Sequence, residues 1–154
     1  MPYGNRREGY VKNDEWYSPK YIFDALDIKF DLDVAAPEGG VPWIPADSHY
    51  TESDDGLVKP WYGRVWMNPP YSEPAKWVDK WIIHNNGFAL LPINKSKWWK
   101  SIWESDAVCV PMKYNIRFVK PDGKEHSIFP LTVLWAIGET NITALKMSNL
   151  GRIR

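Results

Sequence analysis

The residues best suited to chemistry are four consecutive ones, Asn68-Pro69-Pro70-Tyr71, which follow the apolar run Val65-Trp66-Met67. The Asn68 amide oxygen and the carbonyl of Pro69, between the two prolines, can both accept hydrogen bonds from one exocyclic amino group. The Tyr71 ring can stack on the base that carries that group, while Pro69 and Pro70 fix φ and remove competing backbone donors. The pattern predicts a site that aims the amino nitrogen of adenine or cytosine at an electrophile. The alternative is a strand-ending turn without chemistry.

The elements that must position these residues follow from the hydrophobic pattern. Residues 64–67, just before Asn68, predict a strand, and residues 74–85 predict a helix with Trp77, Val78 and Trp81 on one face. Ser18 is a plausible N-cap for a helix over 19–26. A further helix is expected at 95–104, strands at 28–34, 87–92, 107–110, 116–119 and 128–137, and a long loop at 37–59.

Strands that alternate with helices indicate an α/β fold. The last two strands, joined through a turn at 121–124, predict a C-terminal β-hairpin. We expect a loose N-terminal segment at 1–13 and a single domain over 14–154. Ten tryptophans are many for 154 residues. They can pack a core or stack on bases, and we expect most to be structural.

Composition excludes several function classes. The single cysteine, Cys109, rules out an intrachain disulfide and a cysteine metal cluster, and its apolar neighbours predict a buried position. The three histidines show no metal-ligand spacing, so no metal is expected. Without a membrane-spanning stretch or a signal-peptide core, we expect a soluble protein of the cytoplasm.

The net charge of zero conceals an asymmetry. Residues 1–60 hold six Lys or Arg against twelve Asp or Glu, and residues 61–154 hold thirteen against seven. An acidic half could hold a cationic, hydroxyl-rich cofactor, and a basic half could face phosphates. Solvated charges that are merely unevenly shared along the chain are an equally good explanation.

The chain resembles the phage-type DNA N6-adenine methyltransferases, also called Dam-like. The similarity lies in blocks whose order is more specific than any one block. The blocks are 14–19 (DEWYSP), 30–37 (FDLDVAAP), 50–52 (YTE), 54–57 (DDGL), Trp61 and 63–71 (GRVWMNPPY), then more weakly 89–92 (ALLP), 97–99 (KWW) and 115–118 (NIRF). The resemblance implies a small Rossmann-like sheet that binds S-adenosylmethionine at its carboxyl edge.

The resemblance also implies a cofactor site. Asp33 would bind the methionine amino group, and Ala35 would let the backbone approach the ligand. Tyr17-Ser18-Pro19 would close the site, and Asp55-Gly56 would meet the cofactor's adenine, Asp55 being a better candidate than Asp54. The usual Gly-x-Gly run is missing from this chain. Each carboxylate alone is more often a loop or capping residue.

The implied reaction is methyl transfer to the N6 amino group of adenine in double-stranded DNA, with the base flipped out of the stack. Asn68, Pro69, Pro70 and Tyr71 would hold the base without a metal. Lys97, Lys100, Lys120 and Lys124 are candidates for phosphate contacts. With no separate recognition domain, we expect short or relaxed sequence specificity.

Two alternatives stay open at this point. One is a methyltransferase-like module that binds without catalysis. The other is an enzyme that acts on a free nucleotide or a small amine, which a net charge of zero permits.

Overall fold

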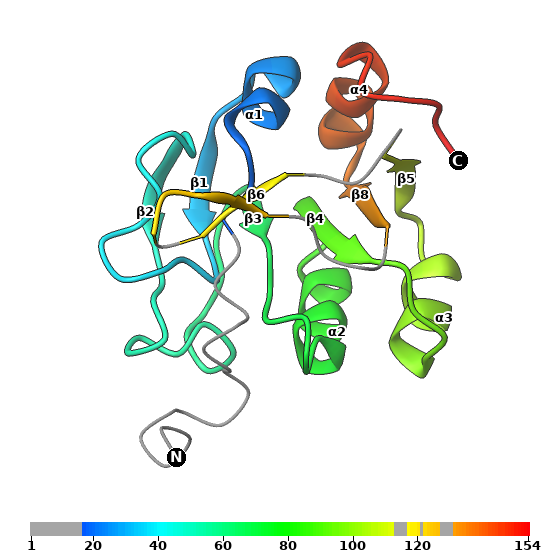
Figure 1. The fold of residues 1–154 in the computed structure, drawn as a ribbon. Coiled ribbons are helices and arrows are strands. Elements are labelled where there is room, and N and C mark those ends of the chain that lie inside the picture. Colours follow the sequence, from blue (N-terminus) through cyan, green and yellow to red (C-terminus); the bar gives the residue numbers. More distant parts are fainter. Residues whose placement is uncertain (1–16, 113–116, 121, 127–130) are drawn as a thin grey trace.

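The computed structural model describes residues 17–112, 117–120, 122–126 and 131–154. Helices cover both faces of a mixed six-stranded sheet (Figure 1). The strand order is β2-β1-β3-β4-β8-β5. The strands are β1 (Phe30–Asp33), β2 (Ala46–His49), β3 (Val65–Met67), β4 (Gly87–Pro92), β5 (Val108–Pro111) and β8 (Thr132–Ile137).

The sheet is parallel from β2 through β1 and β3 to β4, and β8 pairs antiparallel with both β4 and β5. An antiparallel strand within an otherwise parallel sheet, covered by helices on both sides, confirms the expected α/β class. This architecture is consistent with a methyltransferase-like fold.

Alternating side chains divide the core into two layers. Trp66 faces the helices α1 (Lys20–Leu26) and α4 (Glu139–Met147), and its ring lies 4.6 Å from that of Phe23. Val65 and Met67 face the helices α2 (Ala75–His84) and α3 (Lys97–Trp103). This follows from the strand period of two. It confirms the buried face expected of α2, because Trp77, Val78 and Trp81 are all fully buried.

The predicted C-terminal hairpin is wrong in its second strand. The strand β6 (Phe118–Val119) pairs with β7 (Glu125–His126), whereas Thr132–Ile137 forms β8 in the main sheet. Six consecutive buried residues in β8 are typical of a central strand with both faces covered. Residues 116 and 128–130 of the predicted strands lie outside the described part of the chain.

Two other elements were not predicted. The strand β2 lies inside the expected loop at 37–59, and α4 follows β8. The sequence of β2, Ala-Asp-Ser-His, has no apolar alternation, and three of its four residues are exposed. Its strand conformation comes from backbone pairing with β1 at the sheet edge.

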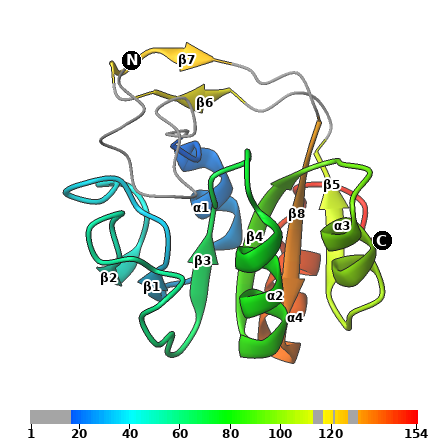
Figure 2. The same cartoon turned by 90° about the horizontal axis from the view of Figure 1, so that it is seen from below.

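The β6–β7 hairpin lies beyond the carboxyl ends of the parallel strands (Figure 2). Two backbone hydrogen bonds attach it to the main body, from Tyr17 N to Val119 O at 2.7 Å and from Val119 N to Tyr17 O at 2.9 Å. The hairpin therefore crosses the edge of the sheet where ligands bind in open α/β folds.

Candidate functional site

The chain changes direction around β1. It passes from β1 to β2 on one side and then to β3 on the other side. In open α/β sheets the crevice between two strands that diverge in this way binds ligands at their carboxyl ends. Asp33 is the last residue of β1, and Asn68 directly follows β3. The fold therefore carries both sequence-predicted residues to this crevice.

One pocket contains much of the predicted site. Asp33 and Asn68 both line it, together with Tyr17, Ser18 and Ala35. The rest of the wall consists of Pro37, Val41, Ile44 and Trp66. Residues that directly precede α1, residues at the end of β1 and residues at the end of β3 thus meet around one small space.

Asp33 is the acidic residue that lines this pocket. Its side chain is 4% exposed, and one carboxylate oxygen accepts a hydrogen bond from Ala35 N at 3.3 Å. Burial raises the pKa of Asp33 to about 7, and the bond from Ala35 opposes that rise only in part. A buried carboxylate gains from a cationic ligand, which would replace the lost hydration of its charge.

Ser18 does not cap the first helix as its sequence position predicts. The N-cap residue of α1 is Pro19, and no side chain caps this helix. The Ser18 hydroxyl is buried without a hydrogen-bond partner, and the residue lines the pocket. The Ser18 carbonyl accepts a 2.7 Å bond from the Trp43 indole. The backbone is therefore fixed while the hydroxyl stays available to a ligand.

Tyr71 lies at the other end of the Asn-Pro-Pro-Tyr segment. Its hydroxyl donates to the Leu90 carbonyl at 2.9 Å, and its ring meets Phe118 edge-on with centroids 6.1 Å apart. Burial raises the pKa of the Tyr71 hydroxyl well above its ordinary value. Pro69 and Pro70 are buried, and Tyr71 is half-buried. The segment is thus a rigid connection between β3 and α2.

Asp55 and Gly56 do not line the pocket but lie beside the end of β1. A Cβ at Gly56 would collide with the Val34 carbonyl, so the loop approaches β1 more closely than any side chain permits. Lys80 donates to the carbonyls of Gly56, Leu57 and Lys59 at 3.1, 3.0 and 2.5 Å.

The neighbouring carboxylate has a structural role. Asp54 accepts bonds from the Thr51 backbone and hydroxyl at 2.8 and 3.1 Å, which lower the pKa of Asp54. These bonds occupy Asp54 in its own turn. Asp55, whose backbone is left-handed at φ 63°, likewise accepts a bond from Leu57 N at 3.3 Å, so these local bonds do not separate the two carboxylates.

The sequence model described as DNA N-6-adenine-methyltransferase (Dam) matches residues 8–129. The chain belongs to this family. Within the Dam family it is 33% identical over 87 residues to the DNA N-6-adenine-methyltransferase of Haemophilus phage HP1, a match that covers 51% of this chain and 49% of that protein.

A second Dam relative is the DNA N-6-adenine-methyltransferase of Escherichia phage T1. It is 36% identical over 96 residues, which cover 56% of this chain and 39% of that protein. The chain thus spans about half the length, or less, of these curated relatives. No solved structure matches it significantly.

A second hollow adjoins the pocket of this Dam-family chain. Its walls share Asp33, Val41 and Ile44 with the first, and include His49 at the end of β2 together with Gly39 and Gly40. Sequence analysis assigned no chemistry to His49, because the three histidines show no metal-ligand spacing. The two hollows therefore adjoin each other at Asp33, Val41 and Ile44.

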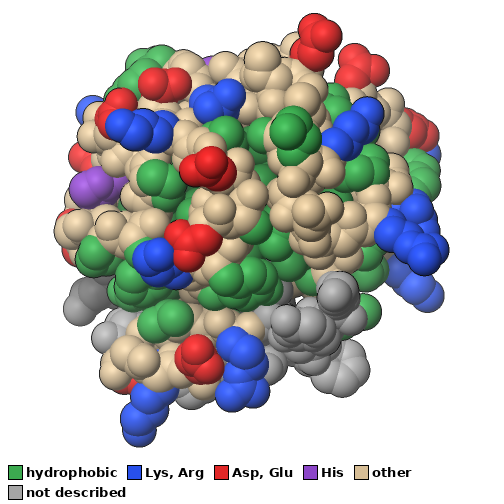
Figure 3. Space-filling model, turned by 90° about the horizontal axis from the view of Figure 1, so that it is seen from above, with side chains coloured by type: hydrophobic (Ala, Val, Ile, Leu, Met, Phe, Trp, Pro, Cys, Tyr) green, Lys and Arg blue, Asp and Glu red, His purple; other side chains and the backbone are tan. Residues whose placement is uncertain are grey.

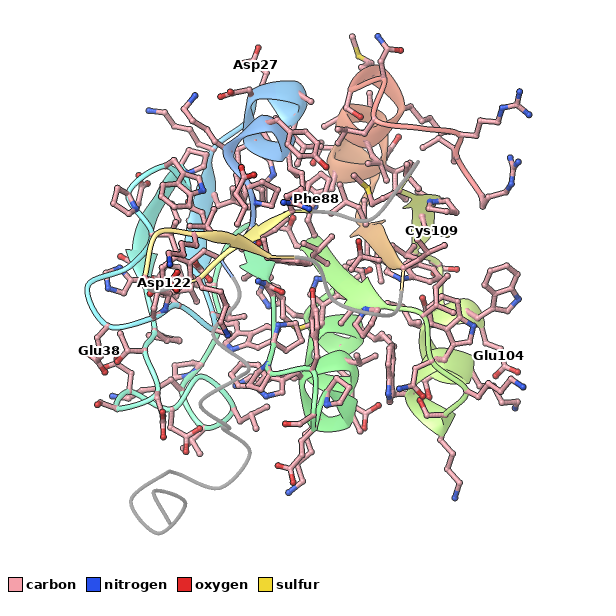
Figure 4. The ribbon with its side chains drawn as sticks, viewed as in Figure 1. Asp27, Glu38, Phe88, Glu104, Cys109 and Asp122 are labelled. Carbon is pink, nitrogen blue, oxygen red and sulfur yellow. The ribbon has the colours of Figure 1, made fainter. Side chains whose placement is uncertain are left out.

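The four candidate phosphate-binding lysines fall into two groups. Lys120 and Lys124 flank Asp122 in the hairpin turn, whereas Lys97 and Lys100 lie on α3, just before Glu104. Figure 4 shows Asp122 and Glu104 on opposite sides of the molecule. In Figure 2 the hairpin turn lies on the side of β2, and α3 lies at the opposite end of the sheet. The hairpin turn and α3 therefore lie on opposite sides of the molecule.

Within the α3 pair, Lys100 forms an exposed ion pair with Glu104 at 3.0 Å. On α3, Trp98 is buried and Trp103 is 61% exposed.

The face over α1 and α4 carries acidic and basic side chains side by side (Figure 3). That face is not a surface of one charge sign on which a nucleic-acid backbone would settle.

Among the described residues, no group of three His, Cys, Asp or Glu side chains could hold a metal ion. No helix in the described ranges is both long and apolar enough to cross a membrane. Cys109 is buried, as its apolar neighbours predict.

Proposed function

We propose that this chain transfers a methyl group from S-adenosylmethionine to the N6 amino group of adenine in DNA. The observation that carries the proposal is that Asp33 and Asn68 line one pocket at the carboxyl ends of adjacent strands. Membership of the Dam family supports the reaction class. The sheet order, with its change of direction at β1, supports a Rossmann-like mode of cofactor binding.

The residues around the pocket fit the proposed methyl donor. S-adenosylmethionine supplies a methyl group on a sulfonium leaving group, and its methionine part carries an ammonium group. Asp33 would bind that ammonium, which relieves the cost of a buried carboxylate. The partnerless hydroxyl of Ser18 would bond a polar group of the ligand. Tyr17 and Ala35 would wall the site. Pro19 would help to close it from the N-terminal side, and Asp55-Gly56 would meet the cofactor's adenine.

The Asn-Pro-Pro-Tyr segment would hold the target. Asn68 and the Pro69 carbonyl would accept the two amino hydrogens of adenine, which aims the nitrogen lone pair into the pocket. Tyr71 would stack on the flipped base. Positioning and electrostatics would provide most of the acceleration. The proton can leave after transfer, so no strong base is needed beside the amine.

The DNA would lie across the carboxyl edge, between the hairpin lysines and the first turn of α3. Phosphate contacts by Lys97, Lys100, Lys120 and Lys124 would place the duplex without selecting a sequence. Sequence choice would come from loops, including residues 37–50 and the 120–127 turn, whose residues 121 and 127 lie outside the described part.

Incubation with labelled S-adenosylmethionine and unmethylated duplex DNA, followed by nucleoside analysis, tests the proposal. The expected product is N6-methyladenine from the wild type and almost none from Asn68→Ala. Methylation of free nucleotides in preference to DNA would instead support a small-substrate enzyme. Failure of folded wild type to transfer methyl to either substrate would support a binding module.

A further inference from the structure

The strand β6 contacts both halves of the proposed site through consecutive residues. Phe118 is fully buried, and its ring meets that of Tyr71 at 6.1 Å and 82°. Tyr71 is held a second time through its hydroxyl, which bonds the Leu90 carbonyl. One contact comes from β4 and the other from β6. The orientation of the Tyr71 ring therefore depends on where β6 sits.

The next residue reaches the pocket wall. Val119 exchanges two backbone hydrogen bonds with Tyr17, at 2.7 and 2.9 Å. Tyr17 lines the pocket that Asp33 and Asn68 also line, and its ring lies 6.4 Å from Trp43. Any movement of Val119 along or away from the sheet edge must therefore move or break the contact with Tyr17.

We propose that β6 is a positioning element that couples the cofactor pocket to the target-base residue, with Phe118 as the positioning residue for Tyr71. The inference rests on the proposed function. One peptide bond joins Phe118 to Val119, so the strand cannot set Tyr17 without also setting the Tyr71 ring. A ligand that orders Tyr17 therefore reduces the loss of conformational entropy when Tyr71 is ordered. The reverse holds equally.

DNA would act on the same strand. Lys120 directly follows Val119, and its amide donates to the Lys124 carbonyl at 3.0 Å across the hairpin turn. Phosphate contacts at Lys120 and Lys124 would therefore fix the hairpin from its outer end. We expect DNA and cofactor to strengthen each other's binding through the hairpin, without any direct contact between the two ligands.

The test measures the affinity of S-adenosylhomocysteine, which permits no turnover, with and without saturating unmethylated duplex DNA. The wild type should bind it at least about fivefold more tightly with DNA present. In Phe118→Leu this ratio should fall toward one, while each ligand alone binds within a few-fold of wild type. The turnover number should fall with Phe118→Leu and recover in Phe118→Tyr, which retains the ring.

Leu145→Ala is the matched control, because Leu145 lies buried on α4 in the same core layer as Phe118, and no residue of α4 lines the pocket. It should lose stability but keep the wild-type ratio. An unchanged ratio in Phe118→Leu, or the same loss in Leu145→Ala, would refute a special role for Phe118.

Hydrogen exchange provides a measurement that needs no variant. The amides of Tyr17 and Val119 should exchange more slowly when either ligand alone is bound. If wild type methylates DNA but the two ligands bind independently, the coupling is wrong and the proposed function stands. If wild type binds neither S-adenosylhomocysteine nor DNA, both proposals fall.

Discussion

The hydroxyl of Tyr71 donates a 2.9 Å hydrogen bond to the carbonyl of Leu90 in the central strand β4. This bond ties the proposed stacking ring to the sheet, so the hydroxyl and the ring have separable roles. Tyr71→Phe should retain stacking and lose about 1 kcal/mol of stability. Tyr71→Ala should also lose roughly 1–3 kcal/mol of base stacking. Melting curves and turnover numbers of both variants check this division, which fails if Phe and Ala impair turnover equally.

Asn68→Ala should nearly abolish methyl transfer and leave the affinity for S-adenosylmethionine within a few-fold of wild type. The proposed contact of Asn68 is with the target amine, although the residue lines the shared pocket. Calorimetry with the cofactor alone, beside a single-turnover assay, separates the two effects. If this variant keeps the wild-type turnover number, the assignment of Asn68 to the active site is wrong.

Cofactor affinity should depend on pH through Asp33. Its pKa is about 7 in the fold, so the carboxylate that binds an ammonium forms only as the pH rises through that value. At about one unit below 7 roughly a tenth of the carboxyl is ionised, and S-adenosylmethionine should bind about tenfold more weakly than above it. Asp33→Asn should bind weakly at every pH. A flat wild-type profile would argue against the assignment.

The same group affects stability in the opposite direction. The folded pKa of Asp33 exceeds its ordinary 3.8, so the unliganded fold binds more protons than the unfolded chain between these values. The contribution of neutral Asp33 to the free energy of unfolding is therefore complete below about 4 and declines as the pH rises toward 7. Asp33→Asn should remove this decline from urea-unfolding curves.

Replacing a lysine that contacts phosphate should weaken binding to all DNA sequences alike and lower the salt slope by about one unit. Of the four candidates, Lys100 should show the smallest effect, because Glu104 already neutralises it. Affinity against salt concentration, measured for each Lys→Ala protein, tests this. If all four variants keep the wild-type salt dependence, these lysines do not contact phosphate. The DNA must then lie along the 37–50 loop, or the substrate is a small molecule.

Lys80 holds the loop that carries Asp55-Gly56 through three carbonyls, and its ammonium lies 5.0 Å from the centre of the Trp61 ring. Burial lowers the pKa of Lys80. Lys80→Met should cost about 1–3 kcal/mol, since it leaves these acceptors without their charged donor, and should weaken cofactor binding. Lys76→Met, an exposed change on the same helix, is the control. If Lys80→Met binds the cofactor as tightly as wild type, Lys80 contributes to stability only.

The sequence predicted best where one-dimensional patterns carry the physics. The apolar face of α2 and the unbroken run of β4 are visible along the chain, and both elements form where expected. The gathering of Asp33, Asn68 and Tyr17 around one pocket could not be derived from composition or periodicity. It depends on strand order, so residues 35 positions apart meet only because β1 and β3 are neighbours.

The failures have equally physical causes. β2 has no hydrophobic signature, because it is a short polar edge strand held by its backbone. Ser18 precedes a proline at a helix start, which is the sequence pattern of an N-cap, yet its hydroxyl is left for the pocket. The partner of β6 is the polar pair Glu125–His126, and only the three-dimensional packing shows that Thr132–Ile137 is taken by the main sheet.

The place of β8 has a consequence for how the protein is made. It is the last strand in the chain, yet it lies between β4 and β5. During synthesis those two strands cannot be joined until residue 137 has left the ribosome, so each presents an open apolar edge meanwhile. A fragment that stops before β8 should therefore aggregate, and folding should be slow compared with that of helical proteins because its pairings are distant in sequence.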